Sequence, residues 1–188
     1  ARESDPIRKA ELLNIASDCA SLTDNPPATF RQALQQIHFL FMGLYMESNA
    51  GGYSPGRMDQ NLYPYYKRDV EAGILTDAEA LELIECMWIK FGEQIWYWNE
   101  PAATHYAGFC AFQNVCIGGV DMDGLDVVNP LSYLMLQATI DTQMVQPSLS
   151  VRLSRKNPED FFLKIAELIQ TGSGFPAIYS DDIGMKQL

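Results

Sequence analysis

The chain has 188 residues, of which 47% are hydrophobic and 11% aromatic, and its formal net charge is -11. This composition is typical of a globular protein with a well-packed core and excludes a disordered chain. The negative charge and the scattered Lys and Arg residues argue against nucleic acid and anionic membrane surfaces as partners, because both need clustered positive charge.

Neither the apolar segments nor the cysteines indicate a membrane or secreted protein. Even the apolar stretch 37–46 is interrupted by His38 and Gly43, and the first residues show no signal-peptide pattern. The cysteines at positions 19, 86, 110 and 116 have neither CxxC spacing nor a disulfide pattern. Reduced thiols in a cytoplasmic protein are the simplest account.

Two helices are predicted in the first quarter of the chain. Asp5 and Pro6 are typical of an N-cap and a first helical position, and the apolar stripe that follows predicts a buried helix ending near Leu22. A second helix is expected after Pro27. Beyond His38 it is apolar on nearly all sides, which is typical of a helix buried in a large assembly, and His38 is expected to be a hydrogen-bonded core residue.

The loop over 49–66 combines glycines, a proline and several polar side chains between two apolar segments. Its glycines and proline require a sharp turn, into which Tyr53, Ser54, Arg57 and Asp59 are set. One interpretation is the wall of a site, held together by an ion pair between Arg57 and Asp59. The other is a structural turn in which these two side chains satisfy buried backbone groups.

Further helices are predicted on the far side of this loop. A short one over 62–72 ends at a glycine, and a longer one begins where Thr76 and Glu79 form a capping box. The apolar positions that follow, through Phe91, have helical spacing. The aromatic segment 96–101 is expected to lead the chain out of this helix.

From about residue 111 the pattern changes to short strands that alternate with helices. Strands are predicted over 115–117, 146–153 and 174–179, and helices begin after Asn129-Pro130 and Asn157-Pro158. This order predicts a parallel sheet wrapped by helices, with ligands at the carboxyl ends of the strands. We therefore expect a predominantly helical α/β chain, a single unit over 1–188 that is mainly helical over 1–110 and strand-helix-strand-helix over 111–188.

Polar side chains accompany the predicted strands. The second strand alternates an apolar face with a face that carries Ser150 and Arg152, and Arg152 is either an anion anchor or one half of a buried pair. Phe112, Gln113 and Asn114 precede the first strand, where an adjacent cavity could use them. Core packing and satisfaction of buried backbone groups is the other interpretation, and it is favoured for the two amides.

The Asp-rich turn over 121–126 is similar to a calcium-binding loop but lacks the rest of the EF-hand pattern. The sequence also contains no nucleotide-binding glycine motif, no HExxH and no paired cysteines. No metal site is therefore predicted.

Six short blocks, taken in order, resemble the glycyl radical enzymes, the superfamily that includes pyruvate formate-lyase. They are Gly-Tyr-Ser-Pro-Gly-Arg-Met-Asp-Gln (52–60), Leu-Tyr-Pro-Tyr-Tyr (62–66), Phe-Gln-Asn-Val-Cys-Ile-Gly-Gly (112–119), Asn-Pro-Leu-Ser-Tyr-Leu (129–134), Gln-Pro-Ser-Leu-Ser-Val-Arg (146–152) and Gly-Phe-Pro-Ala-Ile (174–178). The match is closer to the diol dehydratase and choline lyase branch than to pyruvate formate-lyase itself.

The resemblance implies part of a ten-stranded barrel, in which two five-stranded parallel half-sheets close inside a layer of helices. It also implies a lyase or dehydratase that eliminates a group from a small polar substrate after hydrogen abstraction by a cysteine thiyl radical. It further implies that no cofactor is bound and that a radical S-adenosylmethionine activase installs the glycyl radical on a glycine outside these residues. The other implied partners are the rest of the enzyme and a second copy in a homodimer.

Two family motifs are absent from these residues. Gly-Cys-Val-Glu carries the family's catalytic cysteine, and Arg-Val-(Ala or Ser)-Gly-Tyr carries its radical glycine. We therefore expect an internal part of a larger enzyme, with Cys110 and Cys116 packed and inert. The alternatives are an acyltransferase of the formate-lyase type and a non-catalytic scaffold that kept the fold.

The matching blocks also imply roles for individual residues. Tyr53 and Ser54 fall on a loop that contacts the substrate in relatives, and Phe112 falls where relatives place an aromatic ring against it. No catalytic residue is expected in this chain. The side chains expected to support the wall of the site are Arg57, Asp59, Gln113, Asn114 and Arg152.

Overall fold

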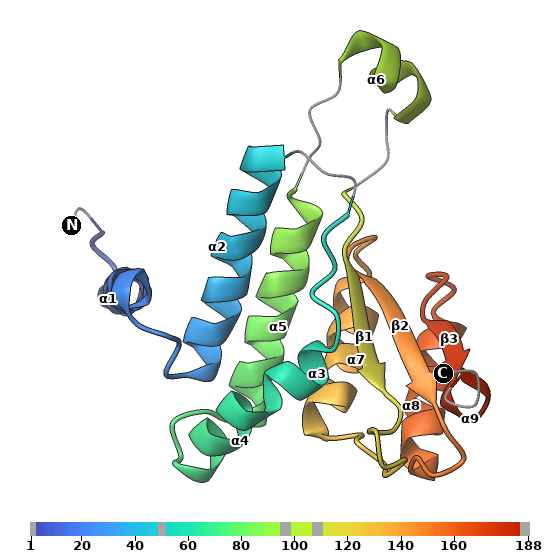
Figure 1. Cartoon of the computed structure of the whole chain (residues 1–188). Helices are drawn as coiled ribbons and strands as arrows, with labels where there is room; N and C mark the ends of the chain where they lie inside the picture. The colour runs from blue at the N-terminus through green and yellow to red at the C-terminus, as the bar shows by residue number, and fades with distance from the viewer. Residues whose placement is uncertain (1–2, 49–51, 95–98, 107–110, 185–188) are drawn as a thin grey trace.

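The computed structural model describes residues 3–48, 52–94, 99–106 and 111–184, which form a helical layer beside a small parallel sheet (Figure 1). The elements are α1 Pro6–Asp24, α2 Phe30–Ser48, α3 Met58–Asn61, α4 Tyr63–Glu71, α5 Asp77–Gly92, α6 Glu100–Tyr106, β1 Asn114–Gly118, α7 Pro130–Thr142, β2 Ser148–Leu153, α8 Glu159–Gln170, β3 Ala177–Ser180 and α9 Asp181–Gly184. None of these helices is long and apolar enough to cross a membrane.

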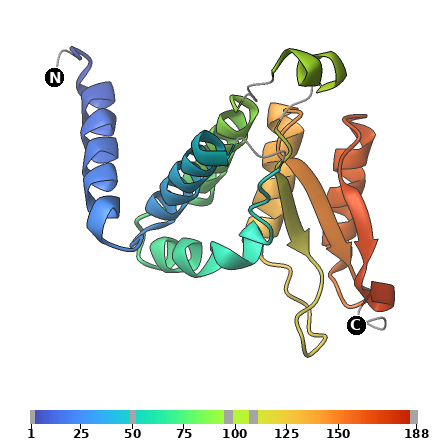
Figure 2. The ribbon, with the colours of Figure 1, turned by 45° about the horizontal axis from the view of Figure 1, so that its top comes forward.

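Helix α1 begins as predicted but is not buried. The Asp5 carboxylate accepts hydrogen bonds from the backbone N–H groups of Ile7 and Arg8, at 2.9 and 3.4 Å, and so caps the helix. No residue of α1 is buried, and Ile7 and Leu13 are 72% and 61% exposed. Figure 2 shows α1 standing apart from the other helices. The predicted burial of its apolar stripe is therefore wrong for this chain, because no described segment covers the stripe.

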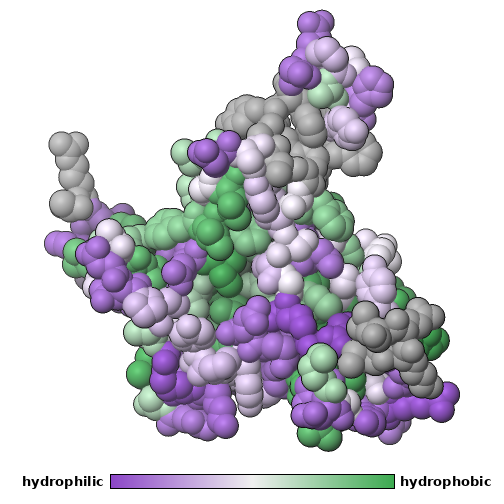
Figure 3. Space-filling view, in the orientation of Figure 1, coloured by the Kyte–Doolittle hydropathy of each residue, from purple (hydrophilic) through white to green (hydrophobic). Residues whose placement is uncertain are grey.

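Helix α2 is covered on one side. Its buried residues are Phe30, Ala33, Leu34 and Phe41. The opposite side exposes Leu40 and Met46, and hydrophobic side chains form a strip over this region in Figure 3. Nδ1 of His38 is buried without a hydrogen-bond partner among the described residues, so the expected hydrogen bond is not found at that atom.

The core joins the helical layer to the sheet. Phe41 of α2 packs edge-on against Phe91 of α5, with ring centroids 5.6 Å apart. Trp88 of α5 is buried, and its Nε1 donates a hydrogen bond to Oγ1 of Thr139 in α7 at 3.0 Å. These contacts fix α5 between α2 and α7.

The predicted capping signals of α5 and α7 are confirmed. In α5 the backbone N–H of Thr76 donates to the Glu79 carboxylate at 2.8 Å, and the N–H of Glu79 donates to the Thr76 hydroxyl at 3.3 Å. In α7 the Asn129 side chain accepts from the backbone N–H of Leu131 at 3.0 Å.

The predicted parallel sheet is also confirmed. It has three strands in the order β1-β2-β3, with Cys116 beside Ser150 and Arg152 beside both Gly118 and Tyr179. The apolar face of the sheet packs on α7 and α8, which cross over between its strands (Figure 1). No described helix covers the opposite face, and all four residues of β3 are exposed.

The glycine-rich loop continues the sheet on the other side of β1. Isolated parallel bridges join Gly52 to Phe112 and Gly56 to Val115. Gly56 accepts from the backbone N–H of Cys116 at 2.8 Å and donates its own N–H to the carbonyl of Asn114 at 3.3 Å. The loop is thus an irregular edge strand, which places its side chains next to those of β1.

Helix α6 was not predicted. It begins at Glu100, where Asn99 caps the first turn by accepting from the N–H of Ala102 at 3.0 Å. The Asn-Glu-Pro start is a signal that the sequence reasoning missed. The predicted aromatic exit from α5 rests on Trp96, Tyr97 and Trp98, which lie outside the described residues, as does Cys110.

Candidate active-site wall

The uncovered face of the sheet is polar and hollow. Side chains on β1 and β2 alternate, so that Asn114, Cys116, Ser150 and Arg152 share this face while their neighbours enter the core. Together with residues of β3 and α9, these four side chains line a concavity of about 550 Å³. We call this surface the polar face.

Asn114 links the polar face to the glycine-rich loop. Its side-chain Oδ1 accepts a hydrogen bond from the Ser150 hydroxyl at 2.8 Å, and its backbone N–H donates to Oγ of Ser54 at 3.2 Å. Ser54 is exposed and lies at the amino-terminal end of β1. The Ser54 hydroxyl is therefore held in place while one side of it remains open.

Phe112 lies at the same end of β1. Its side chain is 50% exposed, and its position in the alternation matches that of Asn114 and Cys116. A Cβ at Gly52 would lie 3.0 Å from the Phe112 carbonyl oxygen, so the loop needs glycine there to approach this closely. Neither Ser54 nor Phe112 is among the residues that line the concavity, which extends toward the carboxyl ends of the strands.

Tyr53 turns toward the helical layer. Its hydroxyl makes a short hydrogen bond with the hydroxyl of Ser48, at the end of α2. Its ring packs edge-on against Tyr45 and Phe41, with centroids 5.2 and 6.3 Å away. In this arrangement Tyr53 supports the loop that carries Ser54.

Gln113 points away from the polar face and is fully buried. Its Nε2 donates to Gln94 Oε1 at 3.0 Å, and its backbone N–H donates to Gln146 Oε1, also at 3.0 Å. Oε1 of Gln113 has no partner among the described residues. Through its side chain and its backbone N–H, Gln113 thus connects the residues after α5 to those before β2, on the core side of the sheet.

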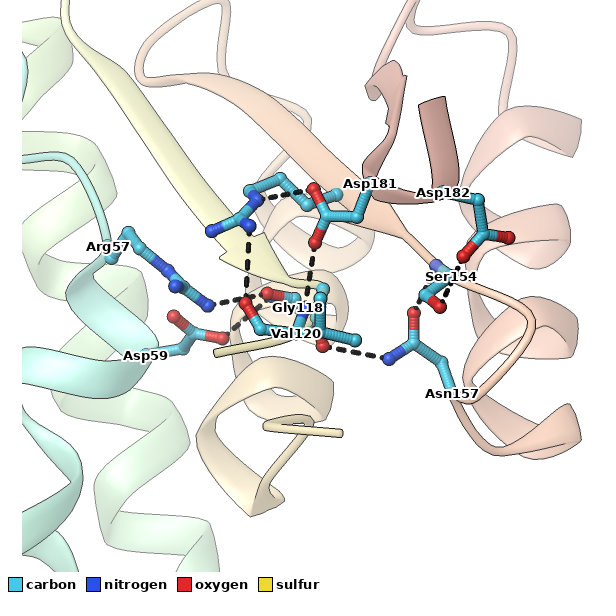
Figure 4. Close-up of polar contacts among 10 residues, drawn as sticks. Arg57, Asp59, Gly118, Val120, Ser154, Asn157, Asp181 and Asp182 are labelled. Atoms are coloured by element: carbon cyan, nitrogen blue, oxygen red, sulfur yellow. Dashed lines mark hydrogen bonds and ion pairs between the residues drawn. The ribbon is translucent and has the colours of Figure 1, made fainter. Parts of the chain in front are cut away.

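Arg57 and Asp59 do not pair with each other. The Arg57 guanidinium donates to the carbonyl of Gly118 at 2.8 Å, and the Asp59 carboxylate accepts from the N–H of the same residue at 2.8 Å (Figure 4). The Ser132 hydroxyl donates to that same carboxylate oxygen at 2.7 Å. No ion pair joins Arg57 to Asp59 among the described side chains, so the predicted pairing is wrong. Both side chains instead satisfy the buried backbone of Gly118, which is the other interpretation that the sequence left open.

Burial is the largest influence on the pKa of Asp59. Its side chain is completely buried, and this raises the pKa of the carboxyl group, while the hydrogen bonds from Gly118 and Ser132 and the charge of Arg57 lower it. Oδ1 of Asp59 and Nε of Arg57 are both buried without partners in the described part of the chain.

Arg152 forms a largely buried ion pair rather than a free anion anchor. Its Nε lies 2.7 Å from the Asp181 carboxylate, and the two side chains are 22% and 8% exposed. A second guanidinium nitrogen donates to the carbonyl of Val120 at 3.2 Å. Of the two interpretations left open by the sequence, the structure shows the buried pair.

Cys116 is less completely packed than expected. It is half-buried and lies on the polar face, among the residues that line the concavity. Burial raises the pKa of its thiol, although the nearby Arg152 lowers it, so the thiol stays protonated at neutral pH. Strand alternation could have placed it, because Val115 and Ile117 on either side of it are both core residues.

The position of Asp181 directly after the third strand predicts that it gathers with Arg152 at the carboxyl ends of the strands, and the structure shows the two paired there. Sequence reasoning missed two other contacts in this region: the Ser132 hydroxyl donates to the Asp59 carboxylate, and the Asn157 side chain donates to the carbonyl of Gly119 at 2.9 Å. Within the described ranges, no cluster of three or more His, Cys, Asp or Glu side chains is arranged to hold a metal ion.

Comparison with known proteins identifies one family over the whole length of the chain. A family model described as pyruvate formate lyase-like matches residues 1–188. The isethionate sulfite-lyase of Bilophila wadsworthia is 40% identical over 181 residues, which cover 95% of this chain and 22% of that enzyme.

Two solved structures are similar to the fold. One is the glycerol-bound form of the B12-independent glycerol dehydratase from Clostridium butyricum, with a TM-score of 0.89, 39% identity, and coverage of 96% of this chain and 23% of that one. The other is a glycyl radical enzyme from Archaeoglobus fulgidus, with a TM-score of 0.88, 34% identity, and coverage of 95% and 23%. The chain therefore spans about a quarter of the length of these relatives. It belongs to the pyruvate formate lyase-like family of glycyl radical enzymes, and its sheet is part of their α/β barrel.

Proposed function

We propose that the chain is part of a glycyl radical lyase or dehydratase that removes a group from a small polar molecule, and that it forms one wall of the reaction chamber. The observation that carries this proposal is the polar face: a parallel sheet that is hollow and uncovered on one side. Parallel sheets are normally covered on both faces, so this surface needs further protein to enclose it.

The chain's own residues supply binding and orientation in this proposal. Ser54 offers a hydroxyl whose oxygen accepts a hydrogen bond from the backbone N–H of Asn114. Phe112, at the same end of the strand, offers a ring that is half exposed. A hydroxyl beside an aromatic surface suits a small substrate that has polar groups on a short carbon skeleton. Tyr53 supports the loop, and Gln113 ties the strand to the core.

The radical chemistry comes from outside these residues. A glycyl radical, installed by a radical S-adenosylmethionine activase, would supply the unpaired electron to a cysteine elsewhere in the enzyme. The whole enzyme would be a cytoplasmic homodimer. The sulfite-lyase and dehydratase names of the relatives support elimination chemistry over formate-lyase acyl transfer.

Activation of the full-length enzyme tests the proposal. The enzyme is treated anaerobically with its activase and S-adenosylmethionine, examined by electron paramagnetic resonance, and supplied with glycerol, propanediol, isethionate or hydroxyproline. We expect a carbon-centred radical and elimination product from at least one of these compounds. A full-length sequence without a radical glycine motif, or an activated enzyme without a radical signal, would contradict it and support the scaffold.

A further inference from the structure

A three-residue turn at the end of β1 is held by side chains in addition to backbone contacts. In the backbone contacts, the carbonyl of Gly119 accepts from the N–H of Val127 at 3.2 Å, and Val120 forms a bridge with Asp126. Gly118 is bound through its N–H and carbonyl by Asp59 and Arg57, each at 2.8 Å. Val120 is bound in the same way: its N–H donates to Asp181 at 2.8 Å, and its carbonyl accepts from Arg152 at 3.2 Å. Figure 4 shows these side-chain contacts converging on the turn, which we call the 118–120 turn.

The arrangement repeats one chemical pattern on both sides of the turn. A carboxylate accepts from a backbone N–H, a guanidinium donates to a backbone carbonyl, and Asn157 donates to the carbonyl of Gly119 between them at 2.9 Å. The four charges cancel, which lowers the cost of burying them. Charge-assisted hydrogen bonds are directional, so this pattern specifies one geometry for the turn.

The two glycines of the turn leave no room for a side chain at either position. Gly118 has a φ of 72°, and a Cβ there would lie 2.7 Å from the Phe161 ring and 2.9 Å from the carbonyl oxygen of Arg152. Gly119 has a φ of 83°, and a Cβ there would lie 2.7 Å from the Cβ of Arg152. The turn is therefore packed directly against β2 and against the helix that follows it.

Two of the side chains connect the turn to the far edge of the sheet. Arg152 is in the central strand, and Asp181 is the first residue of α9, directly after β3. The Asp181 carboxylate uses one oxygen for the N–H of Val120 and the other for the Arg152 guanidinium. It thus links the carboxyl end of β1 to the end of β3, across β2.

We propose that Arg152 and Asp181 are positioning residues that fix the carboxyl ends of β1 and β3 relative to each other, and so set the width of the hollow in the polar face. This inference rests on the proposed function, because the hollow is taken as part of the reaction chamber. Both residues line that hollow. A buried ion pair adds little stability relative to a well-packed apolar pair, but its directional hydrogen bonds specify a geometry that an apolar pair would not.

The substitution Asp181→Asn in the full-length enzyme tests this assignment. Asn has the same shape but one acceptor oxygen, so it can keep the Val120 contact or the Arg152 contact but not both. Asp123→Asn is the matched control: Asp123 is exposed in the turn that follows, and within the described part of the chain its backbone N–H donates to Asp121 while its carboxylate makes no hydrogen bond or ion pair. The measurements are turnover per glycyl radical spin, kcat and KM separately, and the thermal midpoint.

We expect Asp181→Asn to lower kcat per spin by about tenfold or more, because small displacements in a reaction chamber are costly. The thermal midpoint should also fall below that of Asp123→Asn, because the Arg152 charge loses its partner, so turnover is compared per spin at a temperature where both variants are folded. Turnover per spin equal to that of the control would overturn the assignment. So would a loss of turnover that is fully explained by unfolded enzyme.

Two further measurements test the assignment if Asp181→Asn does not fold or if the unaltered enzyme forms no radical. If Asp181→Asn does not fold, Arg152→Lys is used, because a lysine cannot hold Asp181 and Val120 with the same fork geometry; normal turnover per spin would then overturn the proposal. If the unaltered enzyme gives no radical, the proposed function fails by itself. The positioning role is then decided by amide hydrogen exchange at Val120, which must be at least about tenfold faster in Asp181→Asn than in Asp123→Asn.

Discussion

The buried carboxylate of Asp59 gives a sharp prediction about what holds the end of β1. Asp59→Ala removes the acceptor of the Gly118 N–H and of the Ser132 hydroxyl, both of which are buried. Leaving a buried donor without a partner costs about 1–3 kcal/mol, so the two together cost about 2–6 kcal/mol. Asp59→Asn keeps one oxygen in place, and a single oxygen accepts both bonds in the present structure.

Hydrogen exchange at the Gly118 amide in the full-length enzyme measures this difference. We expect Asp59→Ala to accelerate exchange by about 30-fold or more, which corresponds to about 2 kcal/mol at 1.4 kcal/mol per factor of ten. Asp59→Asn should stay within about fivefold of the unaltered enzyme, or about 1 kcal/mol. Equal acceleration in both variants would refute the argument, because it would mean that the charge, and not the acceptor, holds the turn.

The raised pKa of Asp59 also fixes the direction of a pH effect. Burial raises the pKa of this carboxyl group in the folded state above its ordinary value, so the folded state holds the proton more tightly than the unfolded state. The contribution to stability is fully present below the unfolded pKa and is lost as pH rises through the folded pKa. Gly118 protection, corrected for intrinsic exchange, should fall over that window, and the slope should vanish in Asp59→Asn. A slope that persists unchanged would contradict this.

The remaining predictions concern the helical layer and the strand end. Thr76→Ala should weaken the start of α5 by about 1 kcal/mol, seen as faster exchange at the Glu79 amide, whereas Thr76→Ser should not; equal rates would show that the capping box is unimportant. Phe112→Ala should lower kcat/KM of the full-length enzyme by about tenfold or more at constant radical content, while Phe162→Ala, on the outer side of α8, should not; similar effects would count against a substrate contact. Expressed alone, the chain should bind a hydrophobic dye through α1 and the outer side of α2, and a dye-silent, cooperatively folding monomer would contradict that.

Local signals in the sequence predicted most of the elements. The capping box at Thr76 locates the start of α5, because a hydroxyl and a carboxylate three residues apart can satisfy only a helix N-terminus. The alternation at Leu149 and Val151 likewise predicts β2 and which of its faces is polar. Both signals depend on neighbours within a few residues, so a single sequence carries them completely.

Contacts between distant residues were not predictable in the same way. Arg57 and Asp59 are close in the chain and opposite in charge, which suggested a pair, but their partner is Gly118, about sixty positions away. The apolar residues of α1 are not concentrated on one side of the helix, and the sequence does not show what covers them. The face on which Cys116 lies was available from alternation, but its half-burial was not, because that depends on residues distant in the sequence.

The most direct test of the account is an experimental structure of the full-length enzyme with a small polar ligand, such as glycerol, bound. We expect the rest of the enzyme to enclose the polar face and the ligand to contact Ser54 or Phe112. A polar face open to solvent, with the ligand bound on another part of the enzyme, would contradict it.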